Sequence, residues 1–430
     1  MTAHQPDVQK LQIGIIVILV IVYIVQIVTP LRLSTDTVVL LSVAESAARG
    51  GGLLYHGHPS QYPPGYPLLI AALMRVDIAN GWVIVGVSVS SILLGLALAG
   101  RFLLPSFFGR ESSALTICIV SLLSFVTIKY TVIPLTDPLF FGAEMCCLAA
   151  MRSAATRFTW RKLALSAVLV LISISIRKVG ITLIPALLWI VITNPEVRGY
   201  VMRLSFPIKA AGGVLAAFVI GVGVWCFVAG STTRRFAMID TASAVFAGHT
   251  WIDAALNILA YRVKELGEIA INLPYPALPP LIQHLLPFVG ATVFLLVLGG
   301  VYSRRRQLGV ADIFFVSYSA VILVWPYYDP RFWLPVMPFL VAYIGLSMRY
   351  CVQKGISAHV FEAWAVSFAI MGLPVLASST ILSFSGSSFG DRYYTDRYRA
   401  TYCAAGYCER GFDSTQIVDS DALRLLQAFK

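Results

Sequence analysis

The first polar stretch of the chain carries the residue best suited to chemistry. Asp36 closely follows an apolar run that ends at Leu31, so its carboxylate must stay near the surface of any membrane this run crosses. A short helix is predicted over residues 37–49, with Thr35 or Asp36 at its cap and three glycines after it. Asp36 could therefore act as a general base, or it could only cap this helix.

Other polar residues of the same stretch offer weaker signals. Glu45 lies nine positions after Asp36, which at about 100° per residue puts the two on opposite helix faces and excludes a facing acid/base pair. Tyr62 and Tyr66 lie in QYPPGYPLL, a rigid turn that returns the chain to interfacial depth. His56 and His58 could contribute to a metal site, but two ligands without a third equally indicate a surface position.

A second acidic position follows in the turn KYTVIPLTDPLF. Asp137 precedes Pro138, so it could be a functional acid or a helix cap before a proline at the first helical position. Glu144 lies seven residues further on the same helix face, inside an apolar run where an ionisable group is a functional candidate.

Three basic residues are candidates to act together with these acidic residues. Arg177 and Lys178 lie between apolar runs of only about fourteen residues, short of the ~20 that a membrane span needs, so both could lie below the membrane surface. A recessed Arg and Lys suit a phosphate, although either side chain could instead extend to the interface. Arg331 lies in WPYYDPRFWLP, two residues after Asp329, with which it could simply pair.

The composition is that of a polytopic, all-helical membrane protein. Of the 430 residues, 58% are hydrophobic and 12% charged, and the mean hydropathy is +0.80. The net charge of +11 is scattered among apolar runs, which argues against nucleic-acid binding. We predict about eleven spans and a retained first anchor rather than a cleaved signal peptide. The predicted spans are residues 11–29, 81–104, 113–128, 139–151, 163–176, 179–193, 210–229, 285–302, 313–326, 334–348 and 361–383.

Basic residues near alternate span ends predict the orientation. They place three segments outside the cytoplasm: a first outer loop (32–69), a second outer loop (230–284) and an outer C-terminal tail (384–430) of one single domain, 1–430. Within the second, an interfacial helix is expected over 252–271, with charged residues between apolar ones. In the tail, Cys403 and Cys408 could form a disulfide in an oxidising compartment, or remain free thiols if a span is miscounted.

Together these motifs resemble the GT-C superfamily of polytopic glycosyltransferases, closest to the branch of protein O-mannosyltransferases and the aminoarabinose transferase of lipid A. The pattern covers roughly the first 190 residues and again Asp329–Leu346, and it includes the block YYDPRFWLPVMPFL. It consists of Asp36 after the first span, the glycine-rich turn before YPPGYPLL, the Thr136-Asp137-Pro138 turn, and the basic pair Arg177 and Lys178. The family often has a glutamate in place of Asp137 and an acid pair where Thr35 precedes Asp36, which leaves metal binding open. The chain also lacks the large C-terminal periplasmic domain of some members, so the second outer loop or the tail would recognise the acceptor.

The resemblance implies an inverting transfer from a polyprenyl-phosphate-linked sugar donor to a hydroxyl of a lipid, glycan or protein acceptor. We expect this on the extracytoplasmic side of a bacterial inner membrane, which suits the short loops, with the endoplasmic reticulum as the alternative. No firm cofactor is expected beyond a possible divalent cation. The expected site residues divide by role into catalytic Asp36 and Asp137, donor-phosphate-binding Arg177, Lys178 and Arg331, substrate-pocket Tyr62, Tyr66 and Glu45, and metal-binding His56 and His58. Alternatives are a flippase for lipid-linked sugars and a lipid-linked oligosaccharide ligase or polymerase.

Overall fold

The computed structural model of the chain describes residues 5–109, 111–196, 251–354, 359–393, 398–408 and 417–430. In these residues the fold is helical apart from one two-stranded antiparallel hairpin in the first outer loop. The elements of the first half are α1 (Gln5–Val25), η1 (Gln26–Val28), α2 (Thr35–Ala48), β1 (Leu54–Tyr55), β2 (His58–Pro59), α3 (Gly65–Arg75), α4 (Gly81–Leu98), η2 (Ala99–Leu103), α5 (Pro105–Phe108), α6 (Glu111–Leu122), α7 (Phe125–Thr131), α8 (Thr136–Thr156), α9 (Trp160–Ile176), η3 (Lys178–Leu183) and α10 (Ile184–Thr193).

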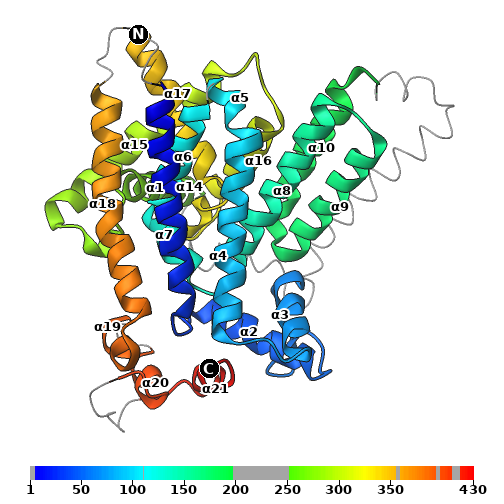
Figure 1. Cartoon of the computed structure of the whole chain (residues 1–430), viewed down its shortest axis with the longest axis vertical. Helices are drawn as coiled ribbons and strands as arrows, with labels where there is room; N and C mark the ends of the chain where they lie inside the picture. Colours follow the sequence, from blue (N-terminus) through cyan, green and yellow to red (C-terminus); the bar gives the residue numbers. More distant parts are fainter. Residues whose placement is uncertain (1–4, 110, 197–250, 355–358, 394–397, 409–416) are drawn as a thin grey trace.

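The second half supplies the remaining long helices and the tail. Its elements are α14 (Trp251–Ile271), η4 (Tyr275–Ala277), α15 (Pro280–Ser303), α16 (Val310–Leu323), η5 (Pro330–Trp333), α17 (Met337–Gln353), α18 (His359–Ser383), η6 (Gly386–Ser388), α19 (Phe389–Tyr393), α20 (Arg399–Ala404) and α21 (Ser420–Ala428). The long helices α1, α4 and α18 run roughly side by side along the long axis of the molecule (Figure 1).

Fewer spans are evident than the sequence predicted. Four helices of the described residues are long and apolar enough to cross a membrane, covering 7–28, 81–108, 280–303 and 362–383, and a bent pair raises the number to five. Other predicted spans coincide with helices that are shorter or more polar, such as α8, α9 and α16. The predicted span 210–229 lies outside the described residues. A total of eleven is therefore not shown.

The bent pair is α6 with α7, which meet at 58°. At the break, the side chain of Asn272 accepts a hydrogen bond from the Phe125 amide (2.7 Å) and donates to the Leu123 carbonyl (2.8 Å). It also donates to the Phe368 carbonyl in α18, at 2.9 Å. Because a broken helix frees backbone groups that an apolar surrounding cannot satisfy, this one amide makes the bend tolerable.

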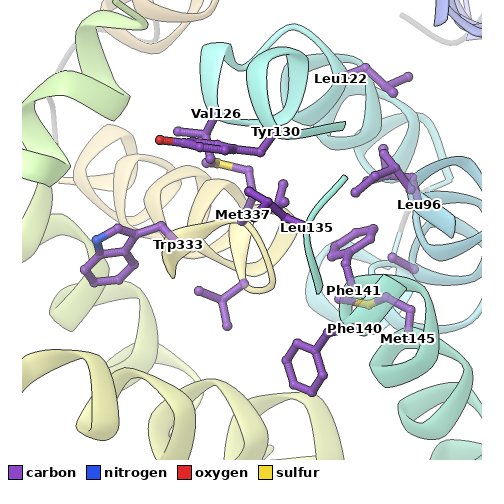
Figure 2. Packing of buried hydrophobic residues seen from close by; sticks show 14 of the residues in the cluster. Leu96, Leu122, Val126, Tyr130, Leu135, Phe140, Phe141, Met145, Trp333 and Met337 are labelled. Atoms are coloured by element: carbon purple, nitrogen blue, oxygen red, sulfur yellow. The ribbon is translucent and has the colours of Figure 1, made fainter. Parts of the chain in front are cut away.

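Close helix packing forms the core around α4 and α8. A Cβ at Gly142 would lie 2.9 Å from the Ser91 carbonyl oxygen, so only glycine allows the two backbones to approach this closely. Figure 2 shows part of the resulting apolar cluster, in which Phe141 of α8 lies near Leu96 of α4. Tyr130 and Trp333 belong to the same cluster, which therefore connects the first half of the chain to η5.

The tail and the first outer loop lie at the same end of the molecule. In Figure 1, α19, α20 and α21 lie at the same lower end of the molecule as α2 and α3, where α1 and α18 also terminate. The sequence left the state of Cys403 and Cys408 open, and the structure joins them in a disulfide. The loop and the tail thus share one end of the fold, and the side of the membrane that this end faces stays a prediction.

Candidate active site

Helix α2 carries Asp36 in its first turn. The helix begins earlier than predicted, because the Ser34 side chain is the cap and accepts a hydrogen bond from the Thr37 amide at 3.2 Å. The prediction of Thr35 or Asp36 as the cap is therefore wrong. Because Ser34 satisfies the free amide, the Asp36 carboxylate is available for other partners.

Two side chains from distant parts of the sequence hold the Asp36 carboxylate. Arg331 Nη1 of η5 lies 2.6 Å from Oδ2, and the Tyr62 hydroxyl donates to Oδ1 at 2.6 Å. The Asp36 side chain remains 28% exposed, so its carboxylate is accessible from the surface of the protein. Burial alone would raise the pKa of Asp36, but the Arg331 charge and the two hydrogen bonds outweigh it and hold the pKa below its usual value of 3.8.

Arg331 bridges two carboxylates. Besides Asp36, its Nε lies 2.8 Å from Asp329 Oδ2. Asp329 in turn accepts hydrogen bonds from the Tyr130 hydroxyl of α7 (3.2 Å) and from the Arg331 amide (3.0 Å). The pairing of Asp329 with Arg331 that the sequence left open is thus present, and it coexists with the contact to Asp36.

A second ion pair joins Asp137 and Arg177. Asp137 lies within the first turn of α8, whose preceding residue Leu135 makes no side-chain cap, so the capping alternative for Asp137 is wrong. The guanidinium of Arg177 lies near the rings of Phe140 (6.0 Å) and Phe332 (5.6 Å). Since Arg177 also lowers the pKa of Asp36, the two ion pairs interact electrostatically and form one site.

Helix α14 contributes charged residues that the sequence reasoning missed. The helix is present where predicted, but three of its charged residues, Arg262, Glu265 and Glu268, are buried within the protein. Glu265 accepts hydrogen bonds from the Asp329 amide (2.7 Å) and from Trp333 Nε1 (2.9 Å) and pairs with Arg262 at 3.0 Å. Glu265 therefore anchors the segment that carries Asp329 and Arg331.

The periodic pattern of α14 identified an apolar face and a charged face, but not which of the two packs against the rest of the protein. Leu256 and Leu259 are 59% and 45% exposed, so part of the apolar face points outward. In a lipid-facing protein that is the expected arrangement, because apolar side chains gain nothing by avoiding lipid. Acids at helical spacing between apolar residues were the only available signal for Glu265 and Glu268.

Two lysines near the site have no ion pair among the described residues. Lys178 follows Arg177 and is half-buried. Lys129 of α7, which the sequence analysis did not single out, is exposed and lies within electrostatic reach of Asp329 and Glu268. Among the described residues, Arg177 and Arg331 are paired with carboxylates, whereas neither of these two ammonium groups takes part in an ion pair.

The remaining expected residues lie elsewhere. Glu45 is buried and pairs with Arg49 and Arg424, on the side of α2 away from Arg331. Tyr66 is fully buried, and its hydroxyl has no hydrogen-bond partner in the described part of the chain. Exposed His56 contacts Asp421 Oδ2 at 2.6 Å, and His58 is exposed on β2.

Metal ligation finds little support in the described residues. The only cluster of potential ligands there is Asp391 with Cys403 and Cys408, and the two cysteines are consumed by their disulfide. Glu144 is fully buried, and neither of its oxygens has a hydrogen-bond partner among the described residues.

No family model matches the sequence, and no curated protein matches it. Among solved structures, ArnT from Cupriavidus metallidurans in the apo state is similar with a TM-score of 0.50 and 16% identity, covering 92% of this chain and 67% of ArnT. ArnT bound to undecaprenyl phosphate gives a TM-score of 0.47 at 13% identity, over 97% and 69% of the two chains. An Archaeoglobus fulgidus oligosaccharyltransferase tethered with an acceptor peptide gives 0.49 at 11% identity, over 92% and 56%.

At these identities the likeness concerns the fold alone. The helices follow a shared arrangement over nearly the whole of this chain, while few residues are the same. The chain therefore shares the fold of ArnT, which agrees with the fold that the sequence resemblance predicted.

Proposed function

We propose that this protein transfers a sugar from a polyprenyl-phosphate-linked donor to an acceptor hydroxyl on the extracytoplasmic face, with inversion at the anomeric carbon. The observation that carries the proposal is the 2.6 Å contact between Asp36 and Arg331, two residues from opposite halves of the chain. It puts a partly exposed carboxylate beside a guanidinium where the first outer loop meets η5. A base and a phosphate-binding cation are the two groups such a transfer requires.

Asp36 acts as the general base in this proposal. Its lowered pKa keeps it ionised at neutral pH, and Arg331 is one cause of that lowering. If Arg331 turns toward an incoming phosphate, the pKa of Asp36 rises and the carboxylate becomes a stronger base. Donor binding would thus activate the base only when a leaving group is in place.

The leaving phosphate would be stabilised by the cations around Asp36. Arg331 and Arg177 can bind phosphate oxygens bidentately, and the ammonium groups of Lys178 and Lys129 supply point charges. Asp137, paired with Arg177, holds that guanidinium in place and is the second acid we assign to the reaction. Tyr62 orients Asp36 through its hydrogen bond.

The lipid-linked donor and the outer location have support of their own. The site lies close to the end of α1, a membrane-span candidate, so a phosphate on a lipid carrier would reach it at the bilayer surface. The tail at the same end holds a disulfide, which is typical of an oxidising compartment. Nucleotide sugars are scarce there, which favours a lipid-linked donor. A bacterial inner membrane is the setting we infer.

The decisive experiment replaces Asp36 by Asn in purified protein. Transfer would be assayed with a panel of polyprenyl-phosphate hexoses and pentoses, and donor binding measured separately. We expect kcat to fall by about 10²- to 10⁴-fold with donor binding retained. The matched control is Asp77→Asn, an exposed aspartate after α3 whose positive φ of 58° asparagine also tolerates.

Near-normal turnover in the Asp36→Asn protein would refute the assignment of the base. A vesicle assay of donor flipping separates the transporter alternative: flipping without transfer by the wild-type protein would replace the enzyme with a flippase. Sugar transfer by the wild-type protein that is lost in Asp36→Asn would exclude the flippase alternative.

A further inference from the structure

Helix α21 packs against the side of α2 that faces away from the ion pairs of the site. Ala422, Leu425 and Leu426 of α21 are buried, and the Phe429 carbonyl accepts a hydrogen bond from the Gly81 amide at 2.8 Å. Gly81 begins α4, so the C-terminal residues connect the first outer loop to the start of a membrane span. The tail is thus part of the packing of this loop.

Polar contacts fix α21 to α2 at one point. Arg424 pairs with the buried carboxylate of Glu45 and donates to the Ser42 hydroxyl at 3.2 Å. Glu45 and Ser42 lie on α2, the same helix whose first turn carries Asp36. A charged contact with a carboxylate that is 5% exposed constrains the helix more than a contact between two exposed groups would.

A second set of contacts fixes α21 to the hairpin after α2. Asp421 accepts from the Tyr55 hydroxyl at 3.3 Å and contacts His56 Nε2 at 2.6 Å. Asp421 also lies 3.2 Å from Arg424, so one short helix holds both α2 and the hairpin. Before α2, the Tyr402 hydroxyl of α20 donates to the Leu31 carbonyl (3.0 Å) and accepts from the Leu33 amide (2.7 Å).

We propose that Arg424, with Glu45 as its partner, is a positioning residue for Asp36, and that α21 is the element which holds α2 in its working orientation. This deepens the proposed function and rests on it. Helix α2 has fourteen residues, too few to stay helical without tertiary contacts. One face contacts Arg331 through Asp36, and the other is held by Arg424.

The test is Arg424→Gln in the full chain, with Arg424→Lys as the conservative variant. Arg399→Gln is the matched control, since Arg399 pairs with Asp391 inside the tail at 3.3 Å. Arg424 is 40% exposed, so its loss should not prevent folding. Three quantities are measured on monodisperse protein: hydrogen–deuterium exchange of residues 35–48, and kcat and KM for a polyprenyl-phosphate sugar donor.

We expect Arg424→Gln to speed exchange in residues 35–48 and to lower kcat by about 10- to 100-fold, with KM for the donor unchanged. Arg424→Lys should restore most of both, and Arg399→Gln should change neither. Unchanged exchange in residues 35–48 would overturn the proposal, as would faster exchange with an unchanged kcat.

The exchange measurement needs no turnover, so it separates the two proposals. If neither the wild-type nor the Asp36→Asn protein transfers any sugar while Arg424→Gln still loosens α2, the proposed function fails and the structural hold by α21 stands. If transfer depends on Asp36 but not on Arg424, only the positioning role fails.

Discussion

Glu265 is the buried carboxylate that holds the segment of Asp329 and Arg331, and replacing it by Gln tests that role through the pH dependence of stability. Burial raises the pKa of Glu265 from 4.5 to about 7, against the opposing effects of Arg262, Trp333 and the Asp329 amide. Between these two values the folded protein keeps a proton that the unfolded chain has lost. The free energy of unfolding therefore falls as the pH rises from about 4.5 to about 7.

The size of this effect follows from the difference between 4.5 and about 7. At about 1.4 kcal/mol for each pKa unit, the carboxyl costs about 3 kcal/mol of stability at the upper end of the range. With an unfolding entropy of about 2.1 cal/mol/K per residue, this corresponds to about 4 °C in Tm for a chain of this length. The Glu265 side chain is fully buried, so solvent screening does not reduce the effect.

A glutamine side chain at this position cannot titrate, but its carbonyl can still accept one of the two hydrogen bonds. Thermal unfolding in detergent micelles at pH values between 5 and 8 should show the Tm of the wild-type protein falling relative to that of Glu265→Gln. Glu268, whose pKa burial also raises, contributes equally to both proteins and cancels from the difference. Glu196→Gln, at an exposed glutamate, serves as the control. A Tm difference that stays constant across this range would refute the reasoning.

Two further substitutions test the ion pairs of the site. In Arg331→Gln, burial raises the pKa of Asp36 with less opposition, so the acid limb of residual kcat/KM should move to higher pH; a limb at the wild-type position would contradict the pairing. Arg177→Gln leaves the Asp137 side chain, 3% exposed, without its guanidinium and should lower the unfolding free energy by about 3–5 kcal/mol. Denaturation of Arg177→Gln, Asp137→Asn and the double variant measures the pair, and equal stability of the wild type and Arg177→Gln would argue against it.

Residue types and order along the chain were enough to indicate much of the site. A charged residue next to an apolar run is costly to place there and is therefore a functional candidate. This criterion selected Asp36, Asp137, Arg177 and Arg331. The structure brings these four together in two interacting ion pairs. Their chemical roles remain predictions that the experiments above address.

The sequence could not provide contacts between distant segments or the direction in which a helix faces. The burial of Arg262 and Glu265 depends on how α14 packs against its neighbours, which its periodicity does not specify. Likewise, the contact of Arg424 with Glu45 joins residues at opposite ends of the chain, and no local pattern marks it. Lys129 was not predicted as a site residue because the sequence did not indicate the bend between α6 and α7.

That bend has a consequence for how the molecule could change over evolutionary time. Asn272 adopts a positive φ of 64° while its side chain joins three helical segments, so backbone geometry and amide chemistry are both required at a single position. Asparagine is among the few residues that adopt a positive φ readily and also carry a side chain that can both donate and accept hydrogen bonds. Substitution there would leave buried peptide groups without hydrogen-bond partners and release the turn that directs Tyr130 at Asp329, which makes Asn272 a point of strong constraint on the fold.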